Sequence, residues 1–356
     1  MTVSLPGAAV AAPQATTPAS TTTTPAADYP TLAEIRATAQ ALQGQVLRTP
    51  VWRWQAGAVP AQLPASTQLW LKLELWQHTG SFKWRGALAN LMALDDAARA
   101  RGLVAASAGN HALTVAHAAA AVGSRATVVM PHTADPVRVA ACRAQGAQVL
   151  LRDSMHAAFD TALALVAQQG LSLIHPYDGH RTALGTATVG LELAEQAGPL
   201  DAVVVPVGGG GLIGGVAAAI KQLQPGCAVY GVEPTGADVM ARSFEAGAPA
   251  VLPHVASVAD SLGAPQALPY SYGVCRRFVD DIVRVDDDAL CAALHHLYTD
   301  LKLAVEPAAA AATAALLGPL RTRLAGQRVG LVLCGTNQDA ARYAPLLARG
   351  AALRAA

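Results

Sequence analysis

From Tyr29 onward, short apolar runs alternate with longer helical stretches, and this alternation limits the possible folds more than any other feature. The apolar runs span residues 69–75, 125–130, 147–151, 201–207, 228–233 and 328–334. Helical stretches such as residues 111–122, 155–169 and 287–303 separate most of them. This order predicts an α/β protein with mainly parallel, twisted sheets flanked by helices. Ligands of such proteins bind on the loops that follow the carboxyl ends of strands.

The stretch from residue 103 to residue 174 contains three compact strand and helix alternations of its own. It predicts a small lobe, residues 103–174, inserted into a larger lobe made of residues 29–102 and 175–356. Residues 1–28 are rich in Ala, Pro and Thr and lack the basic start and apolar run of a secretory signal. We expect these residues to form a disordered tail.

Charge and cysteine content argue against several classes of protein. The 25 basic and 24 acidic residues leave a formal charge of +1, which does not suit binding to nucleic acid or an anionic membrane. No apolar stretch is long enough to span a membrane without Gly, Pro or charge. The five cysteines are scattered, without a C-x-x-C pair or metal-type spacing. We therefore expect a cytoplasmic protein with reduced thiols that acts on a small molecule.

The glycine loop, GGGGLIGG at residues 208–215, follows the apolar run DAVVVPV and precedes a helical stretch. Consecutive glycines at a helix N-terminus present free backbone N–H groups with no Cβ atoms to block an anion, which predicts a phosphate site. The alternative is a tight strand-to-helix crossing that needs glycine only for close packing. No Gly-Lys-Ser/Thr follows, so this is not a nucleoside-triphosphate loop. A dinucleotide site stays open, although its fingerprint normally closes the first strand of its unit.

A second turn, the SAGNH turn at residues 107–111, follows the apolar run LVAA and precedes a helix. Ser107 can cap that helix, Gly109 permits a tight backbone, and Asn110 offers an amide near the helix start. An amide and a row of N–H donors suit a carboxylate or a ring hydroxyl. A plain helix N-cap is the alternative interpretation.

The stretch TGSFKWRG, residues 79–86, sets Lys83 between an aromatic ring and a tryptophan–arginine pair, directly after a turn. A lysine desolvated beside Phe82 would have a lowered amine pKa, because burial disfavours the charged form. Such a lysine is a candidate nucleophile and base. The alternative is a solvated lysine at the start of a helix.

Five motifs occur in a fixed order: SFKWRGA at 81–87, SAGNHA at 107–112, PVGGGGL at 206–212, GVEP at 231–234 and LCGTNQD at 333–339. In this order they resemble the pyridoxal-phosphate enzymes of the threonine and serine dehydratase family, to which serine racemase is closely related. The resemblance covers nearly all of the chain from residue 30 onward. It implies a two-lobed enzyme of fold type II, bound pyridoxal 5'-phosphate and a homodimer.

The resemblance also implies roles for individual residues around the cofactor. Lys83 would hold the cofactor as a Schiff base and take the α-proton of the substrate. Phe82 would pack against the cofactor ring, and Asn110 would hydrogen-bond the 3′ oxygen of the ring. The phosphate would lie on the four glycines Gly208, Gly209, Gly210 and Gly211.

For the substrate, the family pattern implies that Ser107 and His111 receive the carboxylate, with help from Ser81. His111 could equally be a partly buried histidine with a satisfied hydrogen bond. Cys334 would lie opposite the pyridine nitrogen, unless it is simply a small buried strand residue. A neutral thiol cannot keep that nitrogen protonated, so the ring would be a weaker electron sink, which favours elimination over transamination.

Two departures from the family sharpen these expectations. Ala108 takes the place of the serine that serves serine racemase as a second acid/base, so racemisation should be poor. In relatives that bind a divalent cation, an aspartate accompanies the glutamate that corresponds to Glu233, and here Val239 takes the place of that aspartate. A hard cation needs several oxygen ligands. We interpret Glu233 and Asp238 as carboxylates at a helix start rather than a metal site; a divalent-cation site at these two residues is the alternative.

Three further features bear on preference and regulation. Ala187, in the segment 175–190 that adjoins the cofactor in this fold, stands where the family usually has Gly, so substrate preference can differ. Glu306 matches a family glutamate near the cofactor, although a helix-start glutamate explains it equally well. The chain ends soon after its last motif, so we do not expect the C-terminal regulatory domain of biosynthetic threonine dehydratases.

Together these features predict an ammonia-lyase that deaminates L-threonine or L-serine by losing the β-hydroxyl as water. The alternatives are a dehydratase of phenylserine or 3-hydroxyaspartate, a serine racemase, a β-replacement enzyme, and a non-catalytic protein that binds pyridoxal phosphate. The family motifs recognise the shared α-amine, carboxylate and β-hydroxyl, so they do not distinguish between these substrates.

Overall fold

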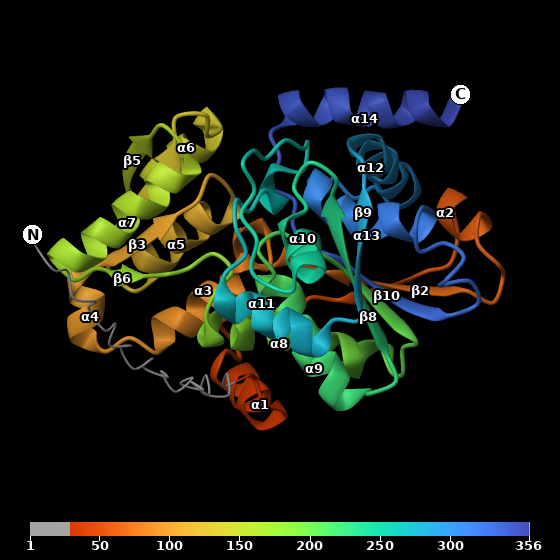
Figure 1. Cartoon of the computed structure of the whole chain (residues 1–356), viewed down its shortest axis with the longest axis horizontal. Helices are drawn as coiled ribbons and strands as arrows, with labels where there is room; N and C mark the ends of the chain where they lie inside the picture. Colours follow the sequence, from red (N-terminus) through yellow and green to blue (C-terminus); the bar gives the residue numbers. More distant parts are fainter. Residues whose placement is uncertain (1–28, 356) are drawn as a thin grey trace, which may run out of the picture.

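The computed structural model describes residues 29–355, which form two sheets covered by helices (Figure 1). The larger sheet has the strand order β1-β2-β10-β7-β8-β9, and the smaller one has the order β5-β4-β3-β6. The pairing of β1 with β2 is antiparallel, and the other strand pairs are parallel. The predicted α/β fold with mainly parallel sheets is confirmed. The predicted tail, residues 1–28, lies outside the described residues.

The larger sheet is made of strands from both ends of the chain: β1 (Val51–Trp54), β2 (Gln68–Leu73), β7 (Ala202–Pro206), β8 (Ala228–Pro234), β9 (Asp281–Val285) and β10 (Arg328–Leu333). Its central strands are apolar without alternation because both of their faces are covered; all five residues of β7 are buried. Figure 1 shows α8 (His180–Ala197) and α9 (Gly211–Leu223) below this sheet. Above it lie α12 (Asp287–Leu301), α13 (Pro307–Leu317) and α14 (Ala340–Ala355).

The smaller sheet contains β3 (Leu103–Ala106), β4 (Ala126–Pro131), β5 (Gln148–Arg152) and β6 (Ser172–Leu173), with the helices α5 (Asn110–Ala121), α6 (Pro136–Ala144) and α7 (Met155–Gln169). All of these elements lie within residues 103–174. However, α3 (Lys83–Met92) packs against α5 as well as α8, and Trp84 and Leu88 belong to the core of the smaller sheet. The exact lobe boundary therefore stays a prediction.

The remaining elements are α1 (Leu32–Ala41), α2 (Ala58–Ala61), α4 (Asp96–Arg101), α10 (Val239–Ala246), α11 (Pro269–Phe278) and the short 3₁₀ helices η1 (Glu74–Trp76), η2 (His78–Gly80) and η3 (Asp260–Leu262). All six predicted apolar runs contain strands. The edge strand β1, the two-residue β6 and the partly exposed β9 lie outside those runs. Such strands lack a continuous apolar pattern because they are not buried on both faces.

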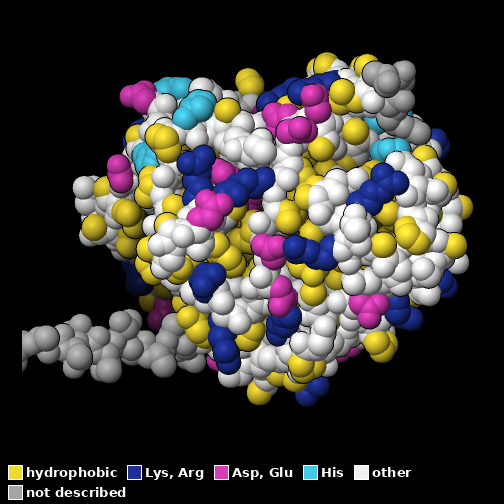
Figure 2. All heavy atoms as spheres, turned by 45° about the vertical axis from the view of Figure 1, so that its right-hand side comes forward, with side chains coloured by type: hydrophobic (Ala, Val, Ile, Leu, Met, Phe, Trp, Pro, Cys, Tyr) yellow, Lys and Arg dark blue, Asp and Glu magenta, His cyan; other side chains and the backbone are white. Residues whose placement is uncertain are grey.

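Surface charge agrees with the composition. Figure 2 shows basic and acidic side chains mixed over the visible face, without a large area of one sign. Among the described helices, none combines the length and the apolar character needed to cross a bilayer. The alanine-rich helix α13 is a core helix, since its residues from Pro307 to Leu316 are buried.

Candidate active site

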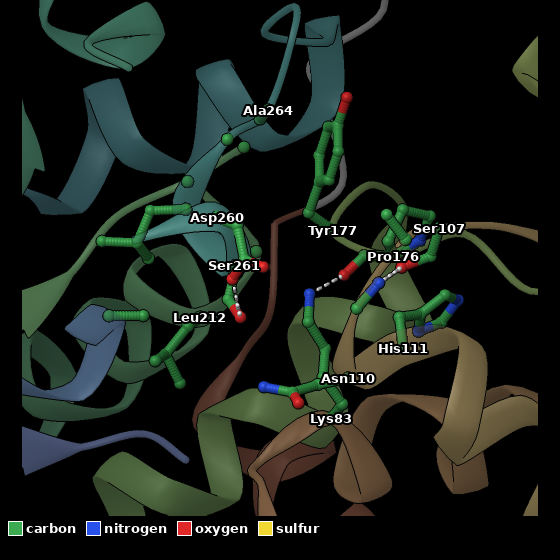
Figure 3. A pocket seen from close by; sticks show the side chains of 18 of the residues that line it. Lys83, Ser107, Asn110, His111, Pro176, Tyr177, Leu212, Asp260, Ser261 and Ala264 are labelled. Carbon is green, nitrogen blue, oxygen red and sulfur yellow. Dashed lines mark hydrogen bonds between the residues drawn. The ribbon is translucent and has the colours of Figure 1, made fainter. Parts of the chain in front are cut away.

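One pocket brings together residues from four of the five motifs (Figure 3). Segments next to both sheets line it: the start of α3, the SAGNH turn after β3, the glycine loop after β7, and the residue after β10. The predicted site residues that line it are Phe82, Lys83, Ser107, Asn110, His111, Gly208, Gly209, Gly210, Gly211 and Cys334. Parallel strands present their carboxyl ends at one edge of a sheet, which explains why these distant segments meet.

Lys83 is the first residue of α3, and its exposed surface lines the pocket. Its Nζ donates a hydrogen bond to the carbonyl oxygen of Pro176 at 2.5 Å and lies 4.9 Å from the centroid of the Phe82 ring (Figure 3). Burial lowers the pKa of the Lys83 amine to about 8. The nearby Cys334 and Glu306 act in the opposite direction and raise this pKa. Lys83 is partly buried and faces the pocket, and its role as the cofactor anchor stays a prediction.

The glycine loop is closely packed, and its geometry is also compatible with a phosphate site. A Cβ atom on Gly209 would lie 2.3 Å from the Tyr177 ring, and one on Gly211 would lie 2.5 Å from the Tyr177 carbonyl oxygen, so close packing requires glycine. Gly210 has a φ of +90° and precedes α9. In the described part of the chain, the amides of residues 208–211 donate no hydrogen bond. These free donors at a helix N-terminus form a cradle that fits a phosphate.

The SAGNH turn differs in one detail from the sequence prediction. Helix α5 begins at Asn110 and its N-cap residue is Gly109, without a side-chain capping bond. Capping by Ser107 is therefore wrong: its Oγ instead accepts the N–H of Gly109 at 3.1 Å. This bond tightens the turn. The first backbone N–H groups of α5 lie at the end of the helix that lines the pocket.

Asn110 is buried and held by two partners. Its Nδ2 donates to both carboxylate oxygens of Glu306, at 2.8 and 3.0 Å, and its Oδ1 accepts from Nδ2 of Asn337 at 2.9 Å. Both bonds from Nδ2 go to the one carboxylate of Glu306, so donation to a ring oxygen requires the amide to give up one of them. Burial raises the pKa of Glu306 to about 7, and Ser261 also donates to this carboxylate at 3.0 Å. Glu306 is the N-cap residue of α13 but makes no capping bond, so its carboxylate serves the pocket.

His111 fits its alternative interpretation well. Its Nε2 lies 2.7 Å from the carbonyl oxygen of Ile174 and must carry the proton, because a carbonyl only accepts. Burial lowers the pKa of His111 to about 3, so the ring is neutral and Nδ1 is an acceptor. A neutral ring in this tautomer does not donate to a carboxylate. The predicted carboxylate contact of His111 stays a prediction, and its backbone N–H is the better donor.

Ser81 and Cys334 lie on opposite sides of a backbone contact. Ser81 is buried, does not line the pocket, and pairs with Gly335 as an isolated bridge. Its Oγ has no hydrogen-bond partner among the described residues. Cys334 is a buried lining residue, and burial raises the pKa of its thiol well above the usual range. The thiol is therefore neutral, as the sequence argument required.

The two carboxylates considered for a metal lie outside the pocket. Glu233 accepts the N–H groups of Met240 and Ala241 at the start of α10, at 2.9 and 2.7 Å. Asp238 pairs with Arg242 and Arg284. Their interpretation as helix-start and ion-pairing carboxylates agrees with these contacts. Ala187, buried within α8, also lies outside the pocket lining.

Sequence reasoning missed several lining residues. Tyr177 comes from the segment 175–190 that was expected to adjoin the cofactor, and Arg138, Met155 and Phe159 come from helices of the smaller sheet. Arg138 forms an ion pair with Asp260 at 2.8 Å across the pocket. These side chains carry no local motif, so only long-range packing identifies them.

Comparisons with known proteins identify the family of this chain. The family model "Pyridoxal-phosphate dependent enzyme" matches residues 42–335. The chain is 52% identical to the phenylserine dehydratase of Ralstonia pickettii, over 90% of this chain and 97% of that protein. The T.th. threonine deaminase superposes with a TM-score of 0.80 and 39% identity, covering 87% of this chain and 99% of that one. Maize serine racemase superposes with a TM-score of 0.81 and 35% identity, covering 86% of this chain and 95% of that one.

The residues present fit the cofactor of this family. The glycine loop offers unpaired amides to a phosphate, and the amine of Lys83 lies in the same pocket, where it can bind an aldehyde. Phe82 and the neutral thiol of Cys334 line the same pocket. With the family model matching most of the chain, the conclusion is that this protein belongs to the pyridoxal-phosphate dependent enzymes.

Proposed function

We propose that this chain is an ammonia-lyase that removes water from a β-hydroxy amino acid and releases a 2-oxo acid and ammonia. The observation that carries the proposal is that Lys83 and the glycine loop face one pocket, which Ala108 lines with a methyl group that has no ionisable proton. L-threonine and L-serine are the first substrates to consider. A cytoplasmic homodimer belongs to the same proposal; the five buried cysteines, all free thiols, support the cytoplasmic location.

Pyridoxal phosphate, when bound, supplies the electron sink that lets the Cα–H bond of the substrate break. The residues of the chain do the rest. The glycine loop would bind the phosphate, and Phe82 and Asn110 would hold the ring. The amine of Lys83 would take the α-proton of the substrate. The first amides of α5 receive the substrate carboxylate.

The choice of elimination over racemisation depends on Ala108. This residue lines the pocket, and its methyl group can neither donate nor accept a proton. The neutral thiol of Cys334 adds to the effect, since it does not stabilise a long-lived carbanion. Loss of the β-hydroxyl is then the favoured outcome.

A larger substrate is the second candidate. The 52% identity to a phenylserine dehydratase over 90% of the chain favours a β-hydroxy amino acid with an aryl group. Both candidates follow the same chemistry and differ only in the group on the β-carbon.

The test is the release of 2-oxo acid and ammonia from L-threonine, L-serine, L-threo-phenylserine and threo-3-hydroxyaspartate by the purified holoenzyme. Release from at least one substrate, absent in Lys83→Ala but present in Lys302→Asn, supports the proposal. Lys302 is an exposed lysine with a φ of +58°, which asparagine tolerates, so it is a matched control. Absence of release from all four, despite the visible absorbance of bound cofactor, would overturn the proposal in favour of a racemase, a β-replacement enzyme or a binding protein.

A further inference from the structure

The N-terminal part of α7 contributes an apolar wall to the pocket. Met155 and Phe159 both line the pocket, and both are half-buried. They are four residues apart, which places them on the same face of the helix, one turn from each other. We call these two side chains the α7 wall. Phe159 also packs against the hydrophobic core of the larger sheet, so the α7 wall lies where the two sheets' cores meet.

The α7 wall is supported on one side by the rings of His175 and Tyr177. The Phe159 ring lies nearly parallel to that of His175, with centroids 5.6 Å apart, and His175 meets Tyr177 edge-on at 4.7 Å. The Nδ1 atom of His175 accepts the N–H groups of Tyr177 and Asp178, at 3.3 and 2.9 Å. These rings are therefore held in place by the backbone and position Phe159 from one side.

The α7 wall and the neighbouring rings of His175 and Tyr177 carry no charge. Burial lowers the pKa of His175 to about 3, so its ring is neutral at physiological pH. Among the described residues, the cations that line the pocket are Lys83 and Arg138. Arg138 is already bound to Asp260 at 2.8 Å and to the carbonyl oxygen of Asn337 at 2.9 Å. A second carboxylate on the substrate would therefore meet no unpaired guanidinium, whereas a phenyl group would meet Met155 and Phe159.

We propose that Met155 and Phe159 select the β-substituent of the substrate, and that they favour an aryl group over methyl, hydrogen or carboxylate. This inference rests on the proposed function and, of its two candidates, favours the second, the aryl substrate, over L-threonine and L-serine. A pocket gains its discrimination between apolar groups from the surface that they bury, and a difference of one or a few carbons changes kcat/KM by roughly 10- to 100-fold. The sulfur of Met155 and the ring of Phe159 both form favourable contacts with aromatic rings.

The first experiment compares kcat/KM for L-threo-phenylserine and L-threonine in the wild-type holoenzyme, Phe159→Ala and Met155→Ala. Phe159→Ala is expected to lower the phenylserine value roughly 10- to 100-fold and the threonine value less than about threefold. Phe159→Leu keeps most of the apolar volume, so its kcat/KM for phenylserine should fall less than that of Phe159→Ala. The matched control is Leu163→Ala, on an exposed part of the same helix, which should leave the ratio unchanged. A ratio that Phe159→Ala and Met155→Ala leave unchanged would overturn the inference but not the proposed function.

A second experiment needs no turnover. L-Phenylalanine and L-alanine lack the β-hydroxyl and cannot lose water, so their dissociation constants from the holoenzyme can be measured by the change in visible absorbance of the cofactor. We expect L-phenylalanine to bind at least about tenfold more tightly, and Phe159→Ala to remove this preference. Equal binding of the two amino acids by the wild-type protein would contradict the role of the α7 wall, whether or not the protein is a dehydratase.

Discussion

Two lysines, Lys72 in β2 and Lys83 at the start of α3, have different surroundings. Lys72, in β2, is buried and donates to the carbonyl oxygen of Thr49, to Glu192 and to Gln196, at 2.7, 2.5 and 2.9 Å, so all three of its protons have acceptors. Lys83 has one acceptor, the Pro176 carbonyl, and forms no ion pair within the described residues. Burial lowers the pKa of both amines; the carboxylate of Glu192, in an ion pair with Lys72, opposes this effect, whereas Lys83 has no ion-pair partner among the described residues.

The region behind α3 is a closed network of charges. Arg85, two residues after Lys83, contacts Glu74 and Glu192 through short hydrogen bonds of 2.7 to 2.9 Å. Its guanidinium also donates to Thr188 and to the carbonyl oxygen of Leu47. Because Arg85 is 0% exposed, this network anchors the start of α3 firmly. The comparison shows that the same helix turns a fully paired arginine to the core and an unpaired lysine to the pocket.

The largest effect is expected from removing the unpaired lysine. Lys83→Ala should lower kcat for the preferred substrate by more than roughly 10³-fold, since both the covalent link and the proton carrier are lost. The free energy of unfolding of the apoprotein should not fall, because no ion pair is broken. Steady-state kinetics and urea denaturation measure the two quantities. A large loss of stability together with activity would show that Lys83 is mainly structural.

Removing the paired arginine should act on stability. Arg85→Met leaves the buried carboxylates of Glu74 and Glu192 without their main counter-ion, which typically costs about 3–5 kcal/mol of unfolding free energy. Urea denaturation of the apoprotein checks this value. Arg85→Lys restores one charge and should recover part of the loss. If Arg85→Met unfolds at the same urea concentration as the wild type, the network does not anchor α3.

Lys72→Met should be milder than Arg85→Met. Glu192 keeps its bonds to Arg85 in this variant, so the unfolding free energy should fall by about 1–3 kcal/mol. The value of kcat should stay within roughly twofold of the wild type, because Lys72 does not line the pocket. A selective loss of kcat in a stably folded Lys72→Met would contradict the division between the two regions.

The smallest effect concerns pH. Only the neutral form of the Lys83 amine can bind the aldehyde of the cofactor, and its pKa is lowered to about 8. The neutral fraction then rises about tenfold between pH 7 and pH 9 and changes little above that. Stopped-flow absorbance after mixing the apoprotein with pyridoxal phosphate should follow this curve. A rate that continues to rise about tenfold per pH unit up to pH 10 would indicate a lysine with an ordinary pKa.

Local patterns in the sequence were enough to predict the fold class and most of the candidate site. The glycine loop, the SAGNH turn and the SFK motif are short segments whose backbone behaviour depends on adjacent residues, so they can be read without the fold. Their order along the chain indicated the family. The two-residue β6 and the edge strand β1 were missed because they have no continuous apolar pattern.

The tertiary structure decided what faces what inside the pocket. Asn110 and Glu306 are 196 residues apart in the sequence, and the packing of the two sheets against each other makes them hydrogen-bond partners. Packing within the smaller sheet turns His111 toward the Ile174 carbonyl, 63 residues away, and the contact with His175 positions Phe159. The sequence by itself determined which chemical groups are present and which backbone turns carry them. Their hydrogen-bond partners and the uncharged α7 wall were decided by long-range packing, because side-chain orientation depends on neighbours that no local pattern specifies.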